Sequence, residues 1–157
     1  MIADIMTASA RRPLLPPFYF LLALILMIAL HFLAPIALWL SPPWSITGVV
    51  PILLGIALAG LGRWQFQRAK TTVYPFETSA RLVTQGLFRW SRNPMYLGML
   101  LALVGTALLL GSAGPLLVLP LFYAVIRLRF IRHEERSLAR QFGSAYHEYT
   151  RKVRRWL

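Results

Sequence analysis

Cysteine is absent from this sequence, and acidic residues are scarce, since only 5 of the 157 residues are Asp or Glu. Without cysteine the chain can form no disulfide, and it offers neither a thiolate nucleophile nor a thiolate ligand for a metal. The 17 Lys and Arg residues leave a formal net charge of +12. In a soluble protein such an excess would suggest nucleic acid as a partner. The positions of the charges along the chain decide whether that explanation applies here.

Charged residues of either sign are missing from two long stretches, residues 14–62 and 93–126. Together with a hydrophobic content of 57%, these stretches are typical of an integral membrane protein. The basic residues lie outside them, with two before the first stretch, six between the two and nine after the second. Cytoplasmic loops of membrane proteins collect Lys and Arg, so topology accounts for the positive charge, and we expect no nucleic-acid partner.

Turn-forming residues divide each uncharged stretch near its middle. The first contains Ser-Pro-Pro-Trp-Ser at 41–45 and the second contains Gly-Ser-Ala-Gly-Pro at 111–115. Each stretch therefore predicts two apolar helices joined as a hairpin. The predicted fold is an all-α integral membrane protein, a single domain over residues 1–157 with spans at about 18–40, 46–64, 94–110 and 114–131. Within the first span, His31 indicates a kink or local polar packing.

Four spans place both chain termini and the loop 63–92 on one side of the membrane, and the positive-inside rule makes that side the cytoplasm. All five acidic residues fall on the same side, so we expect water-soluble chemistry there. The sequence predicts a multi-pass protein of a bacterial inner membrane or its equivalent, whose basic face binds anionic membrane lipids. It does not set the oligomeric state.

Beyond the last span, residues 133–153 predict an amphipathic cytoplasmic helix. Apolar residues recur at spacings of three or four, while Arg132, Arg136 and Arg140 form a second row. Gly143 is expected to bend or end this helix near its middle. Its simplest role is attachment to anionic headgroups, which is compatible with its also closing a site.

Two clusters of polar residues stand at the ends of predicted spans. In the first, Asn93 suits a helix N-cap and Pro94 suits the first helical position. Arg92 and Tyr96 flank this helix N-terminus, whose free amides and dipole favour an anionic ligand group. In the second cluster, His133 precedes two adjacent glutamates. These carboxylates either neutralise nearby arginines or bind a ligand, and they lack the spacing of a zinc site, so we predict no metal.

Four sequence elements, in this order, resemble the membrane methyltransferases typified by isoprenylcysteine carboxyl methyltransferase and phospholipid N-methyltransferases. They are Leu-Val-Thr-Gln-Gly-Leu-Phe at 82–88, Arg-Asn-Pro-Met-Tyr-Leu-Gly at 92–98, Glu134-Glu135 with Leu138, and Phe-Gly-Ser-Ala-Tyr at 142–146 followed by Tyr149. The resemblance runs over residues 71–156. It implies a cofactor, S-adenosylmethionine, bound at the cytosolic membrane edge without a Rossmann fingerprint. The implied activity is methyl transfer to a lipophilic or small membrane-accessible substrate.

The resemblance also implies roles for individual residues. The implied cofactor-binding residues are Leu82, Val83, Phe88, Arg92, Asn93, Pro94, Met95, Tyr96 and Glu134. The implied catalytic residues are Glu134, Glu135 and Arg129. Methyl transfer from a sulfonium is a direct displacement, which needs alignment and desolvation more than a metal or a covalent intermediate.

Two positions depart from the family pattern. The family often has histidine where this chain has Asn93, so a role that depends on an imidazole is not carried over. The prenylcysteine enzymes have a substrate-binding arginine where this chain has Phe130, with Arg129 adjacent. The methyl acceptor therefore stays open between a carboxylate, a thiol, an amine and other groups, as does the choice of Glu134 or Glu135 as a base or only a cofactor ligand.

Two other functions stay open at this point. Sterol reductases look similar around their C-terminal cofactor region, which allows an NADPH-dependent membrane reductase, although the short loops leave little room for a larger dinucleotide. A non-enzymatic lipid-binding membrane subunit would also use the one-sided basic surface.

Overall fold

The computed structural model describes residues 15–34, 36–70 and 80–157. Helices account for most of this described part of the chain, and its single β-bridge lies outside any strand. Some residues that the predicted topology assigns to the cytoplasm lie outside the described residues. They are Asp4, Arg11, Arg12 and Glu77. In chain order the elements are α1 (Pro16–Leu33), η2 (Trp44–Gly48), α2 (Val49–Arg68), η3 (Gly86–Arg89), α3 (Pro94–Leu110), η4 (Gly114–Leu117), α4 (Val118–Ile126), η5 (Arg127–Ile131) and α5 (Arg132–Lys152).

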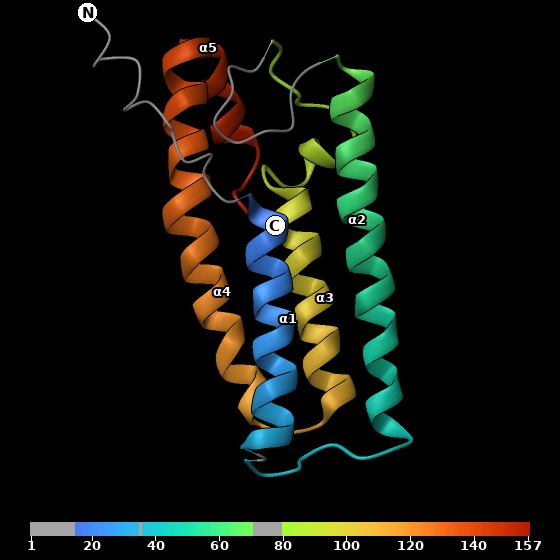
Figure 1. The fold of residues 1–157 in the computed structure, drawn as a ribbon. Helices are drawn as coiled ribbons and strands as arrows, with labels where there is room; N and C mark the ends of the chain where they lie inside the picture. The colour runs from blue at the N-terminus through green and yellow to red at the C-terminus, as the bar shows by residue number, and fades with distance from the viewer. Residues whose placement is uncertain (1–14, 35, 71–79) are drawn as a thin grey trace, which may run out of the picture.

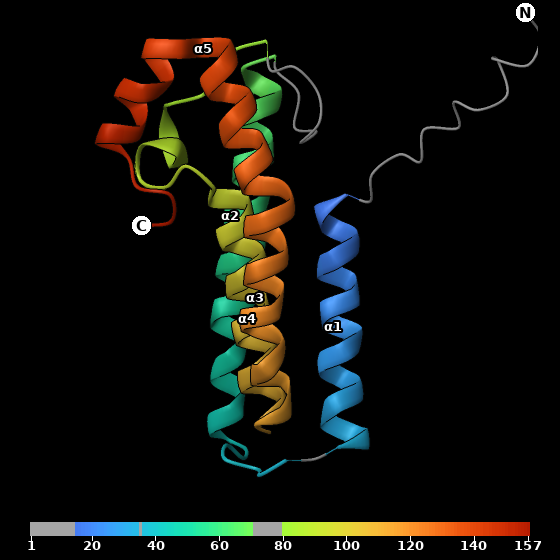
Figure 2. The same ribbon diagram turned by 90° about the vertical axis from the view of Figure 1, so that its left-hand side faces the viewer.

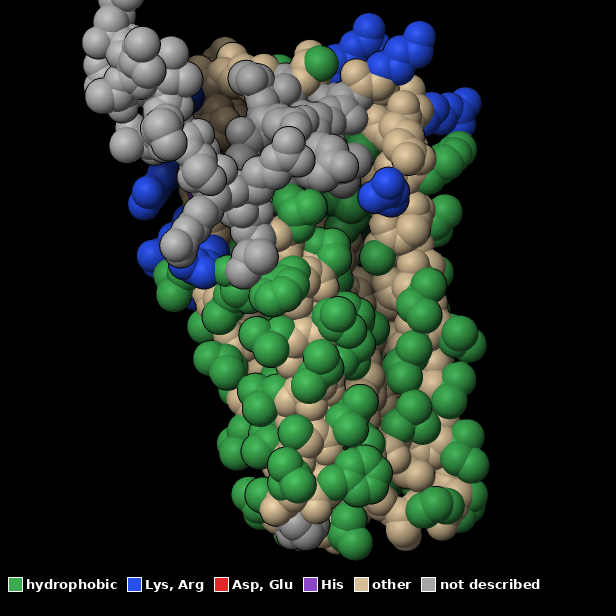
Figure 3. Space-filling model, viewed as in Figure 1, with side chains coloured by type: hydrophobic (Ala, Val, Ile, Leu, Met, Phe, Trp, Pro, Cys, Tyr) green, Lys and Arg blue, Asp and Glu red, His purple; other side chains and the backbone are tan. Residues whose placement is uncertain are grey.

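The first four helices form an elongated bundle in which successive helices alternate in direction (Figure 1). The helical runs Pro16–Leu33, Trp44–Arg68 and Gly114–Lys152 are long and apolar enough to cross a membrane. The fourth apolar helix, α3, has 17 residues and is about 25 Å long at 1.5 Å per residue. Figure 3 shows hydrophobic side chains along the length of the bundle and Lys and Arg at one end. These features confirm the prediction of an all-α protein whose apolar helices could span a membrane.

Glycine determines which helices pack most closely. A Cβ added at Gly55 of α2 would lie 2.4 Å from the carbonyl oxygen of Gly98 in α3, and one at Gly105 would lie 2.4 Å from that of Gly48. Gly48 and Gly55 are seven residues apart, as are Gly98 and Gly105, and this spacing keeps each pair on one face of its helix. Small residues at such positions let the backbones of membrane helices approach, so α2 packs along α3 over most of its length.

The packing of α1 differs from the predicted pair of hairpins. Helix α1 contacts α3, α4 and η4, whereas its contact with α2 is slight, and the two helices stand apart in Figure 1. The core between α1, α3 and α4 contains fully buried Met27, Leu103, Ile126 and Ile131. Since the glycine-lined face of α3 is occupied by α2, the hydrophobic side chains of α1 pack on the opposite side of the bundle.

The first helix ends at Leu33, seven residues before the predicted end at Leu40. The following residue, Ala34, has a non-helical φ of −139°. It precedes a proline, whose ring sterically disfavours the α conformation in the residue before it. The chain then pairs with the turn after α3, where Trp39 donates a backbone hydrogen bond of 3.0 Å to Gly111. The expected polar packing of His31 is confirmed by a 2.8 Å hydrogen bond between its Nδ1 and the hydroxyl of buried Ser112.

The last helix turns sharply over the end of the bundle (Figure 2). Helix α4 continues through the π-helical segment η5 directly into α5, so no loop separates the apolar helix from the charged one. The bend falls at Gly143, as expected, where φ is +50°. A Cβ there would meet nothing within 4 Å, so it is the left-handed backbone, and not lack of space, that calls for glycine.

The glycine contact between α2 and α3 makes a matched prediction. We expect Gly55→Ala to lower the stability by about 1–3 kcal/mol, because the added methyl group would force two backbones apart. The control is Gly60→Ala in the same helix, where a Cβ meets nothing within 4 Å. It should leave stability unchanged or raise it by up to about 1 kcal/mol through helix propensity. Thermal unfolding in detergent measures both, and equal effects would contradict the packing argument.

Candidate active site

A cavity of about 650 Å³ lies where the start of α3 meets α5 and continues down between α1, α2 and α3. This volume is within the range of about 300–1,000 Å³ that is common for small-molecule sites. Its upper end is polar, and its lower end is lined by Phe20, Ile56, Met99 and Ala102, which belong to the membrane-spanning helices. The surface in Figure 3 is hollowed between α1 and α2. One cavity therefore joins a polar site to the apolar part of the bundle.

Glu134 and Tyr96 meet in the polar end of this cavity. The hydroxyl of Tyr96, on the first turn of α3, donates a 2.5 Å hydrogen bond to a carboxylate oxygen of Glu134. Glu134 lies on α5, beyond the apolar part of the last helical run. Burial raises the pKa of Glu134 to about 7, the hydrogen bond from Tyr96 opposes that rise, and the charge of Glu135 adds to it. The carboxyl group can therefore gain or lose a proton near neutral pH.

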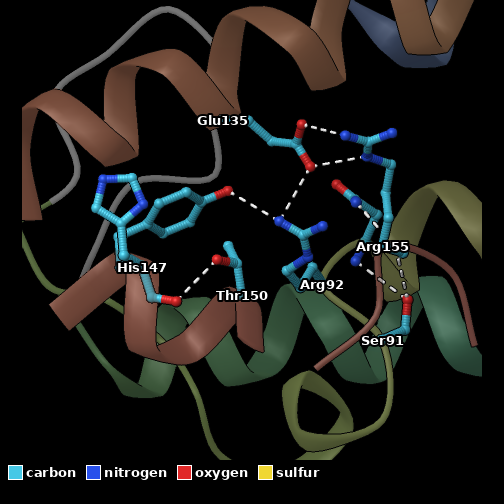
Figure 4. Close-up of polar contacts among 8 residues, drawn as sticks. Ser91, Arg92, Glu135, His147, Thr150 and Arg155 are labelled. Carbon is cyan, nitrogen blue, oxygen red and sulfur yellow. Dashed lines mark hydrogen bonds and ion pairs between the residues drawn. The ribbon is translucent and has the colours of Figure 1, made fainter. Parts of the chain in front are cut away.

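Glu135 is held by two arginines (Figure 4). Arg155 donates two hydrogen bonds of 2.8 Å from Nε and Nη2, one to each carboxylate oxygen, which is the bidentate geometry of a strong ion pair. Arg92 approaches the same carboxylate to 3.2 Å, and its Nη1 also donates to the hydroxyl of Tyr146 at 3.4 Å. The pair formed with Glu135 raises the pKa of Arg155. Two positive groups thus share one negative group at the rim of the cavity.

Asn93 occupies the predicted N-cap position of α3, but its side chain does not cap the helix. Its amide Nδ2 donates a 3.0 Å hydrogen bond to the carbonyl oxygen of Arg155, in the segment that follows α5. The sharp helix start comes from Pro94 at the first helical position and from the amide of Leu97, which donates to the carbonyl of Asn93 at 3.0 Å. The competing acceptor lies 62 residues further along the chain, so no local pattern could predict it.

The apolar wall beside the polar end comes from the segment before α3. Leu82, Val83 and Phe88 line the cavity. The ring of Phe88 packs edge-on against Phe66 of α2, with centroids 5.1 Å apart, and its carbonyl accepts a 2.7 Å hydrogen bond from the hydroxyl of Tyr149. The segment is therefore fixed between α2 and the second half of α5, on the far side of the bend.

The structure brings together in this cavity every residue predicted for the site except Arg129. Arg129 is exposed, and it donates a 2.5 Å hydrogen bond to the hydroxyl of Tyr19 on α1. Arg129 lies in the π-helical segment η5 and does not line the cavity, whereas Glu134 does. The structure gives Arg129 a contact between helices instead.

Several residues that line or hold the cavity carry no sequence signal strong enough to predict them. Arg155 lies among other basic residues in Arg-Lys-Val-Arg-Arg at 151–155, and nothing in that run distinguishes it from its neighbours. Tyr146 and Tyr149 belong to the fourth sequence element but were read as the apolar face of a helix. The other lining residues that sequence reasoning missed include Phe20, Arg63, Phe66 and Arg81.

Among the residues that the structure describes, no three His, Asp or Glu side chains cluster closely enough to hold a metal ion. The donors gathered in the cavity are instead carboxylates, guanidinium groups and tyrosine hydroxyls. Fold and cavity together are those of a helical membrane protein with a candidate ligand site at the end of its bundle where the charged helix lies.

Comparison with known proteins assigns this class to a family. A family model described as phospholipid methyltransferase matches residues 44–145, so the chain belongs to the phospholipid methyltransferase family. The chain is 32% identical over 115 residues to a probable protein-S-isoprenylcysteine O-methyltransferase of Oryza sativa subsp. indica, covering 69% of this chain and 58% of that protein. To protein-S-isoprenylcysteine O-methyltransferase of Homo sapiens it is 31% identical over 115 residues, which cover 69% of this chain and 39% of the relative.

A third relative is the cobalt-zinc-cadmium resistance protein CzcN of Cupriavidus metallidurans, 31% identical over 111 residues that cover 70% of this chain and 51% of CzcN. The chain thus spans less than two thirds of the length of these relatives. No solved structure matches it.

The shielded ion pair at Glu135 makes a second matched prediction. We expect Glu135→Gln to lower stability by about 1–3 kcal/mol, because it removes the counter-charge from Arg92, whose side chain is 15% exposed, and from the more exposed Arg155. The control is Glu148→Gln on the same helix, whose pair with Lys152 has side chains 66% and 70% exposed. Its effect on the unfolding temperature should be much smaller, because an ion pair exposed to solvent contributes little to stability. Thermal unfolding in detergent at low salt measures both, and a loss as large for Glu148→Gln would refute the difference in shielding.

Proposed function

We propose that this protein is an S-adenosylmethionine-dependent methyltransferase that acts at the cytosolic membrane edge on a lipophilic or small membrane-accessible substrate. The observation that carries the proposal is a continuous cavity with Glu134 and Arg92 at its polar end and residues of the apolar helices at its other end. Such a cavity suits two ligands at once, one polar and one apolar. Membership of the phospholipid methyltransferase family supports the same reading.

The residues present fit the cofactor. The carboxylate of Glu134 can bind the ammonium group of its amino-acid end, and Arg92 can bind the carboxylate. The Nε of Arg92 is buried and has no hydrogen-bond partner, which leaves a donor available to an anionic ligand group. Leu82, Val83 and Phe88 would pack against the less polar remainder. The backbone from Pro94 to Tyr96 would close the site from the start of α3.

The cofactor, when bound, supplies a methyl group on a positively charged sulfur. What the chain itself contributes is alignment and exclusion of water, because direct displacement needs the two reacting groups held in line. The apolar walls of the cavity exclude water. They therefore favour the transition state, in which the positive charge of the sulfonium is dispersed, over the starting state, in which it is concentrated on sulfur. Glu134, with its pKa near 7, is placed to bind the cofactor or to take a proton from an acceptor that loses one. Glu135 would act through Arg92.

The lower part of the cavity indicates the kind of acceptor. Phe20, Ile56 and Met99 line it, and all three belong to apolar helices. The named activities of the relatives concern protein-S-isoprenylcysteine, and the family description concerns phospholipids. We infer a lipophilic acceptor that enters along the helices. The positive-inside rule supports a cytosolic site, with both termini and the loop 63–92 on that side and anionic lipids against its basic residues.

Cofactor binding is the direct test. Purified protein in detergent should bind S-adenosylhomocysteine in calorimetry and gain thermal stability from it, whereas NADPH should do neither. Arg151→Ala, at an exposed position of α5 outside the cavity, is a control for substitutions on this helix and should bind as the wild type does. Absence of S-adenosylhomocysteine binding together with stabilisation by NADPH would replace this proposal with a membrane reductase.

The raised pKa of Glu134 predicts how binding depends on pH. The groups around this carboxyl are Tyr96 of α3 and Glu135 of the same helix. An ammonium ligand prefers the ionised carboxylate, so binding below pH 7 requires release of a proton. Affinity for S-adenosylhomocysteine should rise between about pH 5.5 and 7 and then level off. Glu134→Gln should weaken binding about tenfold or more and flatten this rise, and an unchanged pH dependence in that variant would assign the titration to another group.

A further inference from the structure

The five residues after α5 fold back beneath the candidate active site. Their backbone carbonyls accept hydrogen bonds from the segment that begins α3: Arg154 from the amide of Arg92 at 3.0 Å, and Arg155 from Nδ2 of Asn93 at 3.0 Å. The hydroxyl of Ser91, which is buried, also donates to the carbonyl of Arg155 at 3.4 Å (Figure 4). The C-terminal segment is thus attached to α3 through its main chain.

The side chain of Arg155 points the other way, to the start of α5. Its two hydrogen bonds of 2.8 Å take up both carboxylate oxygens of Glu135. One residue therefore connects the two helices that carry Tyr96 and Glu134, whose own hydrogen bond crosses the cavity. The segment is anchored on either side of this residue, because Val153 is buried and the ring of Trp156 packs at 5.3 Å from that of Tyr123.

The charges at this point explain why the connection matters for a ligand. Glu135 has one negative charge, and two guanidinium groups share it. While Arg155 holds both oxygens, Arg92 makes only a 3.2 Å contact with the carboxylate and keeps a buried Nε without a partner. Were Arg155 absent, the carboxylate of Glu135 would be free to form a bidentate pair with Arg92, which would satisfy those donors and neutralise their charge.

We propose that Arg155 is a positioning residue for the cofactor site: by pairing with both carboxylate oxygens of Glu135 it limits Arg92 to a single 3.2 Å contact, which keeps the guanidinium group of Arg92 available to the anionic end of the ligand. This inference rests on the proposed function and goes beyond it. Arg155 does not line the cavity and acts only through Glu135. The chain thus uses its C-terminal segment to set the electrostatics of a site formed by other elements.

Binding of S-adenosylhomocysteine, measured by calorimetry well below the unfolding temperature of each variant, tests the proposal. Arg155→Ala should weaken binding about tenfold or more, and Arg155→Lys, which cannot make the bidentate pair, should weaken it about threefold or more. Arg151→Ala removes the same charge four residues earlier at an exposed position and should stay within about twofold of the wild type.

A double-mutant cycle separates positioning from general support of the fold. In protein that already has Glu135→Gln, adding Arg155→Ala should change the affinity by less than about twofold, because the residue through which Arg155 acts has lost its charge. An equally large loss in both backgrounds would overturn the proposal in favour of a purely structural role.

The remaining outcomes are also decisive. If Arg155→Ala does not fold, Arg155→Lys with unchanged affinity overturns the proposal and weakened affinity supports it. Wild-type binding with unchanged affinity in both Arg155 variants refutes the positioning role alone, whereas a wild type that binds no S-adenosylhomocysteine refutes the proposed function together with it.

Discussion

The close contact between the backbones of α2 and α3 is the constraint on which the rest of the molecule depends. It requires glycine on both helices, since a Cβ at either Gly55 or Gly98 would lie within 2.5 Å of the opposing carbonyl oxygen. In a membrane there is no hydrophobic drive to bring helices together, so close packing of this kind is what selects partners. With α2 fixed on one side of α3, the larger side chains of α1 and α4 form the core on the other side.

The cavity follows from that arrangement. Helices α1 and α2 both lie against α3 but contact each other only slightly, and the space between them is lined by side chains of all three. The glycines that bring α2 to α3 also keep the floor of this space free of bulk, since Gly55 and Gly98 line the cavity themselves. At the upper end α5 turns across the bundle at Gly143, so polar groups close what the apolar helices leave open.

The sequence predicted those parts of the fold that depend on local chemistry. Uncharged stretches and turn residues located the helices, Pro94 the start of α3 and Gly143 the bend. The sequence did not predict which helices pack together. The seven-residue spacing of the glycines marks the face on which α2 packs against α3, whereas the predicted hairpin pairs α2 with α1. The residues that the family resemblance proposed for the site line one cavity, except Arg129, whose side chain contacts Tyr19 of α1 outside it.

The two adjacent glutamates show why one sequence motif had to receive two explanations. Neighbouring residues on a helix point about 100° apart, so Glu134 and Glu135 cannot share one environment. Glu135 meets two arginines and supplies one negative charge to both, which agrees with the simpler interpretation of the motif. Among the described residues, Glu134 accepts a hydrogen bond from a tyrosine hydroxyl and forms no ion pair, in surroundings that raise its pKa to about 7. A carboxyl group without a counter-charge among these residues is suited to receive a cation from outside, and the pairing of both arginines with its neighbour is what leaves it so.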